Sequence, residues 1–305
     1  MKDNAVPEEA LTVKKSISKP NWLKTDIPKG KNYFEIKQRL RSKSLVTVCE
    51  EAKCPNIGEC WQQKTATFMV LGDTCTRACK FCHIKTGNPQ GFLDKGEPLK
   101  VAQSCLEMNL KYAVITMVDR DDLDDGGAEH LCQVVKTIHK YSKTTKVEIL
   151  SGDFTGQEKD ILKVVNSGLI VFAHNIETVK RLSPRVRDAR AQYQKSLDVL
   201  KLAKKLSKSK IYTKSAIMLG LGETRQELIE ALTDLRRYEV DFITIGQYMR
   251  PTKKHLSVKK WIHPDEFKEL SQIAKELGFL SVASGPLVRS SYKAYDYFMK
   301  KGSQL

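Results

Sequence analysis

Six of the eight cysteines in this chain lie between residues 49 and 82, in two groups of three. The spacing is C-x4-C-x5-C for Cys49, Cys54 and Cys60, and C-x3-C-x2-C for Cys75, Cys79 and Cys82. Cysteine thiolates this close in sequence can surround a metal, and they are the usual ligands of iron–sulfur clusters. Because such clusters and zinc sites ordinarily take four protein ligands, each group leaves one position unassigned. In the second group, an open iron position could bind a molecule that reacts.

Disulfides and zinc are two other common uses of grouped cysteines. Disulfide frameworks are typical of short secreted chains, whereas this chain has 305 residues and no secretory segment before the cysteines. Zinc sites usually contain C-x2-C pairs, with a second pair or histidines at finger spacing. His83 directly follows Cys82, but adjacent residues rarely reach one tetrahedral ion together. The spacing therefore favours iron–sulfur clusters.

The second cysteine group resembles the signature of radical S-adenosylmethionine (SAM) enzymes, because an aromatic residue, Phe81, precedes its last cysteine. In that superfamily, three cysteines hold a cluster whose fourth iron chelates the amino and carboxylate groups of SAM. The resemblance therefore gives a use for the open iron position.

Composition and charge narrow the class of protein. The chain is 41% hydrophobic and 29% charged, as expected for a globular protein. No apolar run approaches the ~20 residues of a membrane helix and the N-terminus has no signal-peptide core, so we expect a cytoplasmic protein. The net charge of +16, from 52 basic and 36 acidic residues, favours an acidic partner, either nucleic acid or protein. Because the basic residues are scattered, charge alone does not choose between these partners.

Strand-like and helix-like segments alternate from residue 65 onward. The strand-like runs lie near residues 66–71, 111–118, 146–151, 169–174, 211–217 and 241–247. Helical patterns lie near residues 98–109, 128–141, 157–166, 192–206, 225–238 and 264–277. Thr224 and Glu227 form a capping-box pattern, and Gly278 stands where the last of these helices should end.

Six β–α units in succession predict a parallel sheet with helices on its outside. Six units are too few for a closed eight-fold barrel, so we expect an α/β fold with a partial (β/α)6 barrel, which is also the radical SAM architecture. The barrel would span residues 65–278, between an N-terminal extension, 1–64, and a C-terminal extension, 279–305. Active sites of barrels gather at the carboxyl ends of the strands. The segments expected there are rich in polar groups and comprise residues 119–127, 151–153, 174–177, 218–223 and 247–250.

Longer strings in the chain resemble lipoyl synthase, a family of radical SAM enzymes. They are CEEAKCPNIGECW, CTRACKFCHI, DRDDLDDGGAEH, HNIET, RDARAQYQKSL, MLGLGET and VRSSYKA, and they follow that family's order from Cys49 to Ala294. The paired cysteine groups together with RSSY are the most specific of these features. Ala216 is a departure, because we expect glycine at this position of the family pattern.

The resemblance implies sulfur insertion at two unactivated carbons of an octanoyl chain, which is amide-linked to a lysine of a carrier domain. Such C–H bonds offer no acidic proton, so a radical is needed. A 4Fe-4S cluster at the second cysteine group would pass one electron to SAM, releasing methionine and a 5′-deoxyadenosyl radical. A second 4Fe-4S cluster at the first group would be consumed as the sulfur donor, and two SAM molecules would be used per product.

The same resemblance assigns the fourth ligand of this second, auxiliary cluster to Ser291, the second serine of RSSY. A serine alkoxide is a harder and rarer iron ligand than a thiolate, which suits a cluster that is dismantled. From the residues alone, Ser290 or Ser291 could instead cap the final helix. Cys105 and Cys132 lie within helical patterns, and we expect them to be core or surface thiols rather than ligands.

Other site residues and partners also follow from the resemblance. Gly126 and Gly127 resemble the segment whose backbone receives the SAM amino group, and we expect Asn175, Arg190 and Glu223 to contact SAM or substrate. The implied carriers are octanoylated lipoyl domains of the 2-oxoacid dehydrogenase acyltransferase component and the glycine-cleavage H protein. The reaction would also need an electron donor such as flavodoxin or ferredoxin, and a carrier that repairs the cluster. Neither membrane nor nucleic acid is expected as a partner.

Two other classes of protein share part of this pattern. A radical SAM enzyme that modifies RNA would use the second cysteine group and the basic charge, but it would not explain the first group together with RSSY. An iron–sulfur electron carrier would need neither six β–α units nor an open iron position. Formation of 5′-deoxyadenosine from SAM and a reductant separates the enzymes from the carrier.

Overall fold

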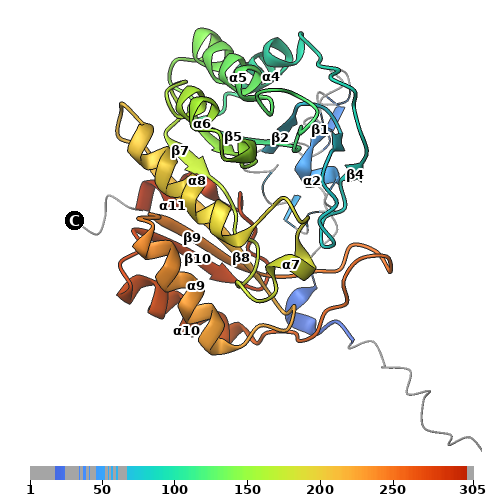
Figure 1. Cartoon of the computed structure of the whole chain (residues 1–305), viewed down its shortest axis with the longest axis vertical. Helices are drawn as coiled ribbons and strands as arrows, with labels where there is room; N and C mark the ends of the chain where they lie inside the picture. The colour runs from blue at the N-terminus through green and yellow to red at the C-terminus, as the bar shows by residue number, and fades with distance from the viewer. Residues whose placement is uncertain are drawn as a thin grey trace, which may run out of the picture.

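A mostly parallel sheet of eight strands forms the centre of the molecule (Figure 1). The computed structural model describes residues 18–24, 34, 37–38, 41, 46–51, 54, 56–57, 60 and 67–300. The strands, in the order in which they pair, are β1 (Val46–Thr47), β2 (Thr67–Val70), β5 (Tyr112–Met117), β6 (Lys146–Leu150), β7 (Val171–Ala173), β8 (Tyr212–Leu219), β9 (Phe242–Gln247) and β10 (Ser281–Gly285). β1 is antiparallel to β2, and all other neighbours are parallel. A separate parallel pair joins β3 (Thr74–Cys75) to β4 (Lys85–Thr86).

Helices cover the outer face of the sheet (Figure 1). The long ones are α4 (Glu97–Glu107), α5 (Ala128–Tyr141), α6 (Glu158–Val165), α8 (Tyr193–Leu206), α9 (Arg225–Arg237) and α10 (Pro264–Glu276). The shorter ones are η1 (Asn21–Leu23), α2 (Val48–Glu51), η2 (Phe154–Gly156), α7 (Ser183–Val186) and α11 (Ala294–Lys300). Their sequences are amphipathic: in α5, Leu131 and Val135 are buried, whereas Gln133 and Lys136 are exposed. In the part of the chain that the structure describes, no helix is long and apolar enough to cross a membrane.

The predicted α/β fold with a partial barrel is confirmed. Every predicted strand and helix overlaps an observed element, and the two edge strands of the described sheet, β1 and β10, do not pair with each other. β10 was not predicted, because its sequence, SVASG, is short and contains few apolar residues. It continues the parallel sheet beyond residue 278, while the predicted division at residues 64 and 65 lies outside the described residues.

Local signals at the ends of two helices act as the sequence predicts. Thr224 Oγ1 accepts a hydrogen bond from Glu227 N at 3.2 Å, and Glu227 Oε2 accepts one from Thr224 N at 2.8 Å. This capping box starts α9. Gly278 follows the C-terminal end of α10 with a φ angle of +90°, a conformation that costs glycine little.

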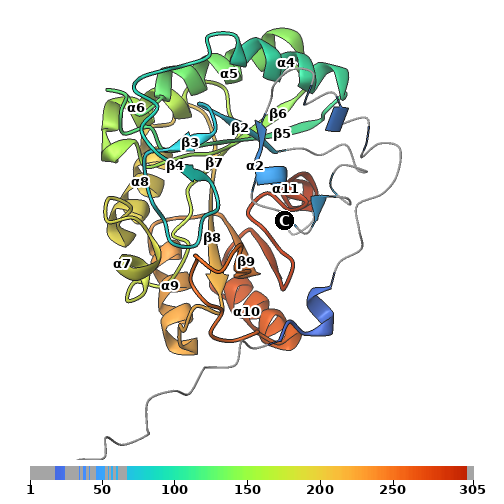
Figure 2. The same ribbon diagram turned by 90° about the vertical axis from the view of Figure 1, so that its right-hand side faces the viewer.

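Side chains of the strands alternate between the two faces of the sheet and form two apolar cores. The outer core lies between the sheet and the helices and includes Phe68, Ile115, Ile149 and Phe172. The inner core lies at the amino ends of the strands and consists of Tyr112, Val114, Val171, Phe242, Ala294 and Phe298. Because its last two members belong to α11, this helix closes the inner side of the open barrel (Figure 2).

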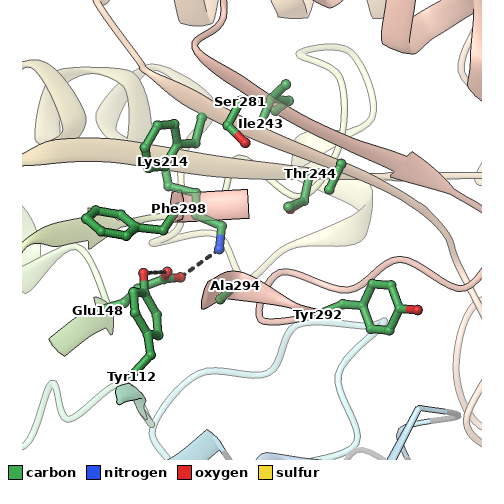
Figure 3. A pocket seen from close by; sticks show the side chains of 11 residues that line it. Tyr112, Glu148, Lys214, Ile243, Thr244, Ser281, Tyr292, Ala294 and Phe298 are labelled. Atoms are coloured by element: carbon green, nitrogen blue, oxygen red, sulfur yellow. Dashed lines mark hydrogen bonds and ion pairs between the residues drawn. The ribbon is translucent and has the colours of Figure 1, made fainter. Parts of the chain in front are cut away.

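A buried polar group lies inside the barrel, next to α11 (Figure 3). Lys214 Nζ lies 2.7 Å from Glu148 Oε1, and the Tyr112 hydroxyl donates to Glu148 Oε2 at 2.6 Å. Burial, followed by the charge of Glu148, raises the pKa of Tyr112. The three side chains satisfy one another, as buried polar groups must. They stand at the amino ends of the strands and so belong to the floor of the barrel, opposite the edge where barrels bind ligands.

Candidate active site

The second cysteine group lies on a loop that follows the carboxyl end of β2 and is closed by the β3–β4 pair. Cys75 ends β3 and pairs with Thr86, and its carbonyl accepts a hydrogen bond from Gly87 N at 2.9 Å. Inside the loop, Cys82 N donates to Cys79 O at 3.0 Å. These contacts gather the three half-buried cysteines at the mouth of the barrel.

The sulfur atoms of this loop have surroundings that suit an iron–sulfur cluster. Arg77 N lies 3.4 Å from Cys75 Sγ, and Asp188 N lies 3.3 Å from Cys79 Sγ. Burial raises the pKa of all three thiols, to about 12 for Cys79 and about 11 for Cys82, and in both of these a neighbouring cysteine adds to the increase. A metal cluster held by these residues would replace the thiol protons, because thiolates are the form of cysteine that ligates metals. Three thiols on one loop, two of them with a backbone N–H group at the sulfur atom, are therefore the type of donor that an iron–sulfur cluster takes.

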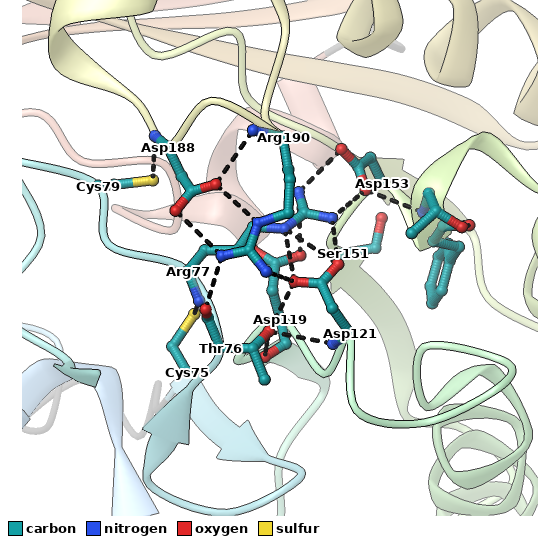
Figure 4. Close-up of polar contacts among 12 residues, drawn as sticks. Cys75, Thr76, Arg77, Cys79, Asp119, Asp121, Ser151, Asp153, Asp188 and Arg190 are labelled. Atoms are coloured by element: carbon teal, nitrogen blue, oxygen red, sulfur yellow. Dashed lines mark hydrogen bonds and ion pairs between the residues drawn. The ribbon is translucent and has the colours of Figure 1, made fainter. Parts of the chain in front are cut away.

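Arg77 fastens this loop to the sheet (Figure 4). Its side chain is only 2% exposed and donates to both carboxylate oxygens of Asp153, at 2.6 and 2.8 Å. It also donates to both oxygens of Asp121, with a shortest distance of 2.8 Å, and lies 3.6 Å from Asp119. Because Asp119 and Asp121 follow β5 and Asp153 follows β6, one side chain ties the loop to the carboxyl ends of two strands.

The three carboxylates around Arg77 differ in their affinity for protons. Burial raises the pKa of Asp119 to about 6, and the charge of Arg77 only partly opposes this increase. Burial also acts to raise the pKa of Asp121 and Asp153, but hydrogen bonds from Arg77 outweigh it and hold both below the ordinary value. Asp121 and Asp153 are thus ionised partners of a buried cation, which is the arrangement that makes its burial tolerable.

A second contact to the loop comes from the segment before α8. Asp188 accepts a hydrogen bond from Ala78 N at 2.9 Å, and hydrogen bonds from Arg190 contribute most to holding the pKa of Asp188 well below its ordinary value. Arg190 donates to Thr76 O at 2.7 Å and forms an ion pair with Asp121 at 3.1 Å. Since Arg190 is 47% exposed, its guanidinium is also accessible from solvent.

Gly126 and Gly127 form the turn that begins α5, with φ angles of +59° and +88°. A Cβ atom at Gly127 would lie 2.5 Å from Leu71 Cδ1, so this position needs glycine for space as well as for conformation. Leu71 directly follows β2 and precedes the cysteine loop. The turn therefore packs against the chain that leads to the cysteines.

Asn175 and Glu177 place two polar groups after β7. Asn175 Nδ2 donates to Glu177 Oε1 at 3.0 Å, whereas the buried Asn175 Oδ1 has no hydrogen-bond partner among the described residues. Glu177 has a φ angle of +65°, which is uncommon for a residue other than glycine. Burial raises the pKa of Glu177, and its charge contributes to the raised pKa of Cys79 and Cys82. The pair therefore lies near the cysteines and has an acceptor to spare for a polar ligand.

Glu223 holds the turn that follows β8. Its carboxylate accepts hydrogen bonds from Gly220 N at 2.5 Å and from Leu221 N at 2.9 Å. Gly220 has a φ angle of +97°, and a Cβ atom there would meet Gln247 and the carbonyl of Lys260. Glu223 therefore shapes a tight turn at the barrel mouth.

The first cysteine group meets the C-terminal segment that contains RSSY. Asn56 Nδ2 donates to Leu287 O at 2.6 Å, although the two residues are 231 positions apart. Burial raises the pKa of Cys54, while a backbone hydrogen bond at Asn56 and the charge of Arg289 oppose the increase. Arg289 in turn donates to the carbonyl of Gln247, the last residue of β9, at 3.3 Å. Cys54 is thereby held at the carboxyl end of the sheet, beside the segment that leads to RSSY.

Ser291 lies in a turn before α11, which begins at Ala294. The residue next to the helix is Lys293, so neither Ser290 nor Ser291 occupies the cap position in this structure. The Ser291 hydroxyl makes no hydrogen bond to any residue that the structure describes. No described residue therefore competes with another ligand for this hydroxyl.

The remaining cysteines differ in what the structure describes. Cys60 is half-buried, whereas the side chain of Cys49 lies outside the described residues and only its backbone is placed, in α2. Cys105 and Cys132 are buried in the outer core, as predicted, and burial raises their pKa to about 12 and about 11. Among the side chains that are described, no group of three or more His, Cys, Asp or Glu is arranged around a single metal ion.

Comparison with known proteins decides the family. A model described as the radical SAM superfamily matches residues 69–235, and one described as the N-terminal domain of lipoyl synthase matches residues 3–54. The lipoyl synthase of Halorhodospira halophila is 54% identical over 276 residues, which are 90% of this chain and 82% of that protein. The mitochondrial lipoyl synthase of Schizosaccharomyces pombe is 53% identical over 286 residues, which are 92% of this chain and 77% of that protein. The chain belongs to the lipoyl synthase family.

Solved structures from outside the lipoyl synthase family share the fold. HydG, a maturase of the [FeFe]-hydrogenase, matches 80% of this chain and 61% of its own, with a TM-score of 0.55 and 14% identity. Methylornithine synthase matches 64% of this chain and 56% of its own, with a TM-score of 0.51 and 14% identity. At this identity the likeness shows the radical SAM fold alone.

The roles of two residues at the mouth of this lipoyl synthase family member, Arg77 and Glu177, were not predicted from the sequence. Arg77 stands inside the cysteine loop, and the acid-rich segment after β5 could have suggested its partners, because a buried cation must be paired. Glu177 stands two positions after Asn175, but nothing local indicates its left-handed backbone. The roles of both residues depend on contacts between the ends of different strands.

Proposed function

We propose that this chain is a lipoyl synthase, which inserts two sulfur atoms into an octanoyl chain carried on a lysine of a carrier domain. The observation that carries the proposal is the presence of members of both cysteine groups at the carboxyl ends of one parallel sheet. Cys75 lies on the loop after β2, and Cys54 lies beside Arg289, which contacts the end of β9. Two clusters at one mouth suit a reaction that needs both a radical and a source of sulfur.

Cys75, Cys79 and Cys82 would hold a 4Fe-4S cluster whose fourth iron binds SAM. When bound, this cluster supplies the electron that cleaves SAM and thereby the radical that takes hydrogen from an unactivated carbon. Two arginines of the chain hold the loop in place. Arg77 donates hydrogen bonds to Asp153, and Arg190 donates a hydrogen bond to the carbonyl of Thr76. A loop fixed in this way keeps the reacting groups in one geometry.

Four sites around this loop would contact SAM or substrate. The turn formed by Gly126 and Gly127 would approach SAM with its backbone, because neither residue has a side chain of its own. Asn175 offers its unpaired Oδ1 as an acceptor, and Arg190 offers an exposed guanidinium. Glu223 would contact SAM or substrate from the turn that it holds after β8.

Cys49, Cys54, Cys60 and Ser291 would hold the auxiliary 4Fe-4S cluster. When bound, this cluster supplies the sulfur atoms. The uncommitted hydroxyl of Ser291 and the contact between Asn56 and Leu287, which joins the two segments, support this ligand set. Two SAM molecules would be consumed for each product, one for each carbon–sulfur bond.

The proposed partners follow from this chemistry. The acyl carriers are octanoylated lipoyl domains of the 2-oxoacid dehydrogenase acyltransferase component and the glycine-cleavage H protein. A flavodoxin or ferredoxin would supply electrons, and a further carrier would rebuild the auxiliary cluster. We place the reaction in the cytoplasm, because thiolate ligands need a reducing compartment.

The proposal is tested with the reconstituted holoenzyme and an octanoyl-lysine peptide. We expect SAM and a reductant to give 5′-deoxyadenosine and a peptide whose mass shows two added sulfur atoms. Replacing Cys75, Cys79 and Cys82 together by alanine should abolish both products but leave one of the two clusters in place. Continued formation of 5′-deoxyadenosine by this variant would overturn the assignment of the two cysteine groups.

A further inference from the structure

Two segments at the barrel mouth carry basic residues without any acidic ones. They are residues 78–93, which include most of the cysteine loop, and residues 248–263, which join β9 to α10. Neither segment contains Asp or Glu. Five of their exposed basic side chains, which we call the basic rim, are Lys80, Lys85, Arg250, Lys253 and Lys254.

Hydrogen bonds join the two segments next to the cysteines. Leu256 N donates to Lys80 O at 3.3 Å, and His255 Nε2 lies 2.9 Å from Cys82 O. The rings of His83 and His255 meet edge to face, with their centroids 5.4 Å apart. Both segments project on the same side of the molecule, to the right in Figure 1. The basic rim is therefore one surface beside the site at which SAM is proposed to bind.

The charges of the basic rim are not neutralised within the described chain. None of its five side chains forms an ion pair there, and Arg250 donates only to carbonyl groups of its own loop, those of His255 and Lys253. Lys260, at the far end of the same segment, is different because it pairs with Glu266 at 2.8 Å.

Three acidic side chains near the mouth have cationic partners, whereas Glu177 and Glu223 form no ion pair with a described residue. Asp121 and Asp153 pair with Arg77, and Asp188 pairs with Arg190. Because the two rim segments contain no acidic residue and their five basic side chains are exposed, the basic rim itself presents positive charge to solvent. Such a surface attracts an acidic partner and repels a basic one.

We propose that the basic rim is the docking surface of the acyl carrier, and that the carrier presents an acidic protein surface around its octanoyl-lysine. This inference rests on the proposed function, because a substrate attached to a protein brings that protein's surface to the mouth. The octanoyl-lysine arm has to reach the cysteine loop, so the carrier must bind to the residues that surround this loop. Exposed charges at the edge of an interface act mainly on the rate of association.

Charge reversal at the rim tests the docking surface. The double variant Lys253→Glu, Lys254→Glu is compared with Lys140→Glu, Lys205→Glu, which makes the same change in net charge. Lys140 and Lys205 are exposed in the last turns of α5 and α8, near the opposite edge of the sheet. The holoenzymes are titrated with an octanoylated lipoyl carrier domain, and each is also given a short octanoyl-lysine peptide.

We expect the rim variant to bind the carrier domain about tenfold more weakly, or worse, and to convert the peptide as the wild type does. The control variant should bind the carrier within about twofold of the wild type. Equal weakening in both variants would show that only net charge matters, and unchanged binding in the rim variant would remove the rim from docking. Either result would overturn the proposal.

Two further outcomes separate this inference from the proposed function. If the wild type converts neither the peptide nor the carrier, the proposed function is wrong, even if the carrier binds. If the rim variant loses binding to RNA but keeps its affinity for the carrier, the surface serves nucleic acid and the docking proposal is wrong.

Discussion

Among single residues, Arg77 shows how the cysteine loop is held in place. Its guanidinium makes paired contacts with Asp121 and Asp153, and the side chain is almost completely buried. The planar guanidinium has five N–H donors and can make a paired contact with each of two carboxylates, whereas the three donors of a lysine ammonium lie on one nitrogen atom and do not match this geometry. The position of the loop relative to β5 and β6 therefore depends on arginine at this site.

Replacing Arg77 by lysine should reduce stability although the charge is kept. We expect the free energy of unfolding in urea to fall by about 1–3 kcal/mol, because buried carboxylate oxygens lose donors. Binding of SAM to the reconstituted enzyme should also weaken. The matched control is Arg181→Lys, since Arg181 makes the same paired contact with Glu227 but is 53% exposed. The control should change stability less than Arg77→Lys does, because exposed ion pairs contribute little, and equal losses in both variants would argue against a special role for Arg77.

Ser291 allows a second prediction at this scale. Ser291→Ala should leave SAM binding and cleavage intact but give little or no product with sulfur, because the auxiliary cluster loses its proposed serine ligand. Product per folded enzyme and iron content measure the two effects separately. Ser290→Ala is the matched control and should form product normally. Near-normal product from Ser291→Ala, with impaired product from Ser290→Ala, would move the ligand by one residue.

At the scale of elements, α11 links the floor of the barrel to the proposed auxiliary site. Phe298 packs on Tyr112 and Tyr212, with ring centroids 5.7 and 6.0 Å apart. The segment just before the helix contains Arg289, which reaches the carboxyl end of β9. A short helix that is anchored by its apolar face can thus hold a ligand-bearing segment that has little regular structure of its own.

Phe298→Ala should therefore affect the two proposed clusters differently. The loss of a buried aromatic side chain costs about 3–5 kcal/mol in a protein core, and we expect this cost to loosen α11 first. Iron bound at the first cysteine group should decrease, while 5′-deoxyadenosine formation persists. Phe92→Ala is the control, because Phe92 is 74% exposed and its removal should change neither property. Loss of both clusters together in Phe298→Ala would show that the helix supports the whole barrel instead.

At the scale of the whole molecule, charge is unevenly placed around the mouth. The chain has a net charge of +16, and Asp121, Asp153 and Asp188 near the cysteine loop are paired with arginines. The unpaired positive charge beside the loop is that of the basic rim. A distribution of this kind orients an acidic partner before contact and accelerates its association.

Binding of the carrier domain should consequently weaken as salt is added. The range of electrostatic attraction falls from about 10 Å at 0.1 M salt to about 3 Å at 1 M. We expect the association rate to decrease across a titration from about 50 mM to about 500 mM salt, with a smaller effect on the dissociation rate. SAM binding, measured over the same titration, serves as the comparison. If the affinity for the carrier does not change with salt, the basic residues do not attract the carrier and serve another purpose.

The order of the β–α units, the fold class and the spacing of the two cysteine groups can be read from the amino-acid sequence without the structure. Each of these is a local property: the period of apolar residues marks a helix or strand, and the spacing of cysteines limits what one loop can bind. Helix ends were also predictable, as Thr224 and Gly278 show, because a cap uses groups within a few residues. The short strand β10 was missed for the same reason, since its residues carry too weak a local pattern.

Which distant residues meet at the mouth became evident in the folded chain alone. Arg77 pairs with Asp153 across 76 positions of sequence, and Asn56 meets Leu287 across 231. The left-handed backbone of Glu177 is likewise held by hydrogen bonds to Ala216 and Met218 in β8. Such contacts depend on the register of the whole sheet and on where the chain crosses its edge, and no local propensity encodes either one. The sequence therefore specified the chemical groups, and the fold specified their partners.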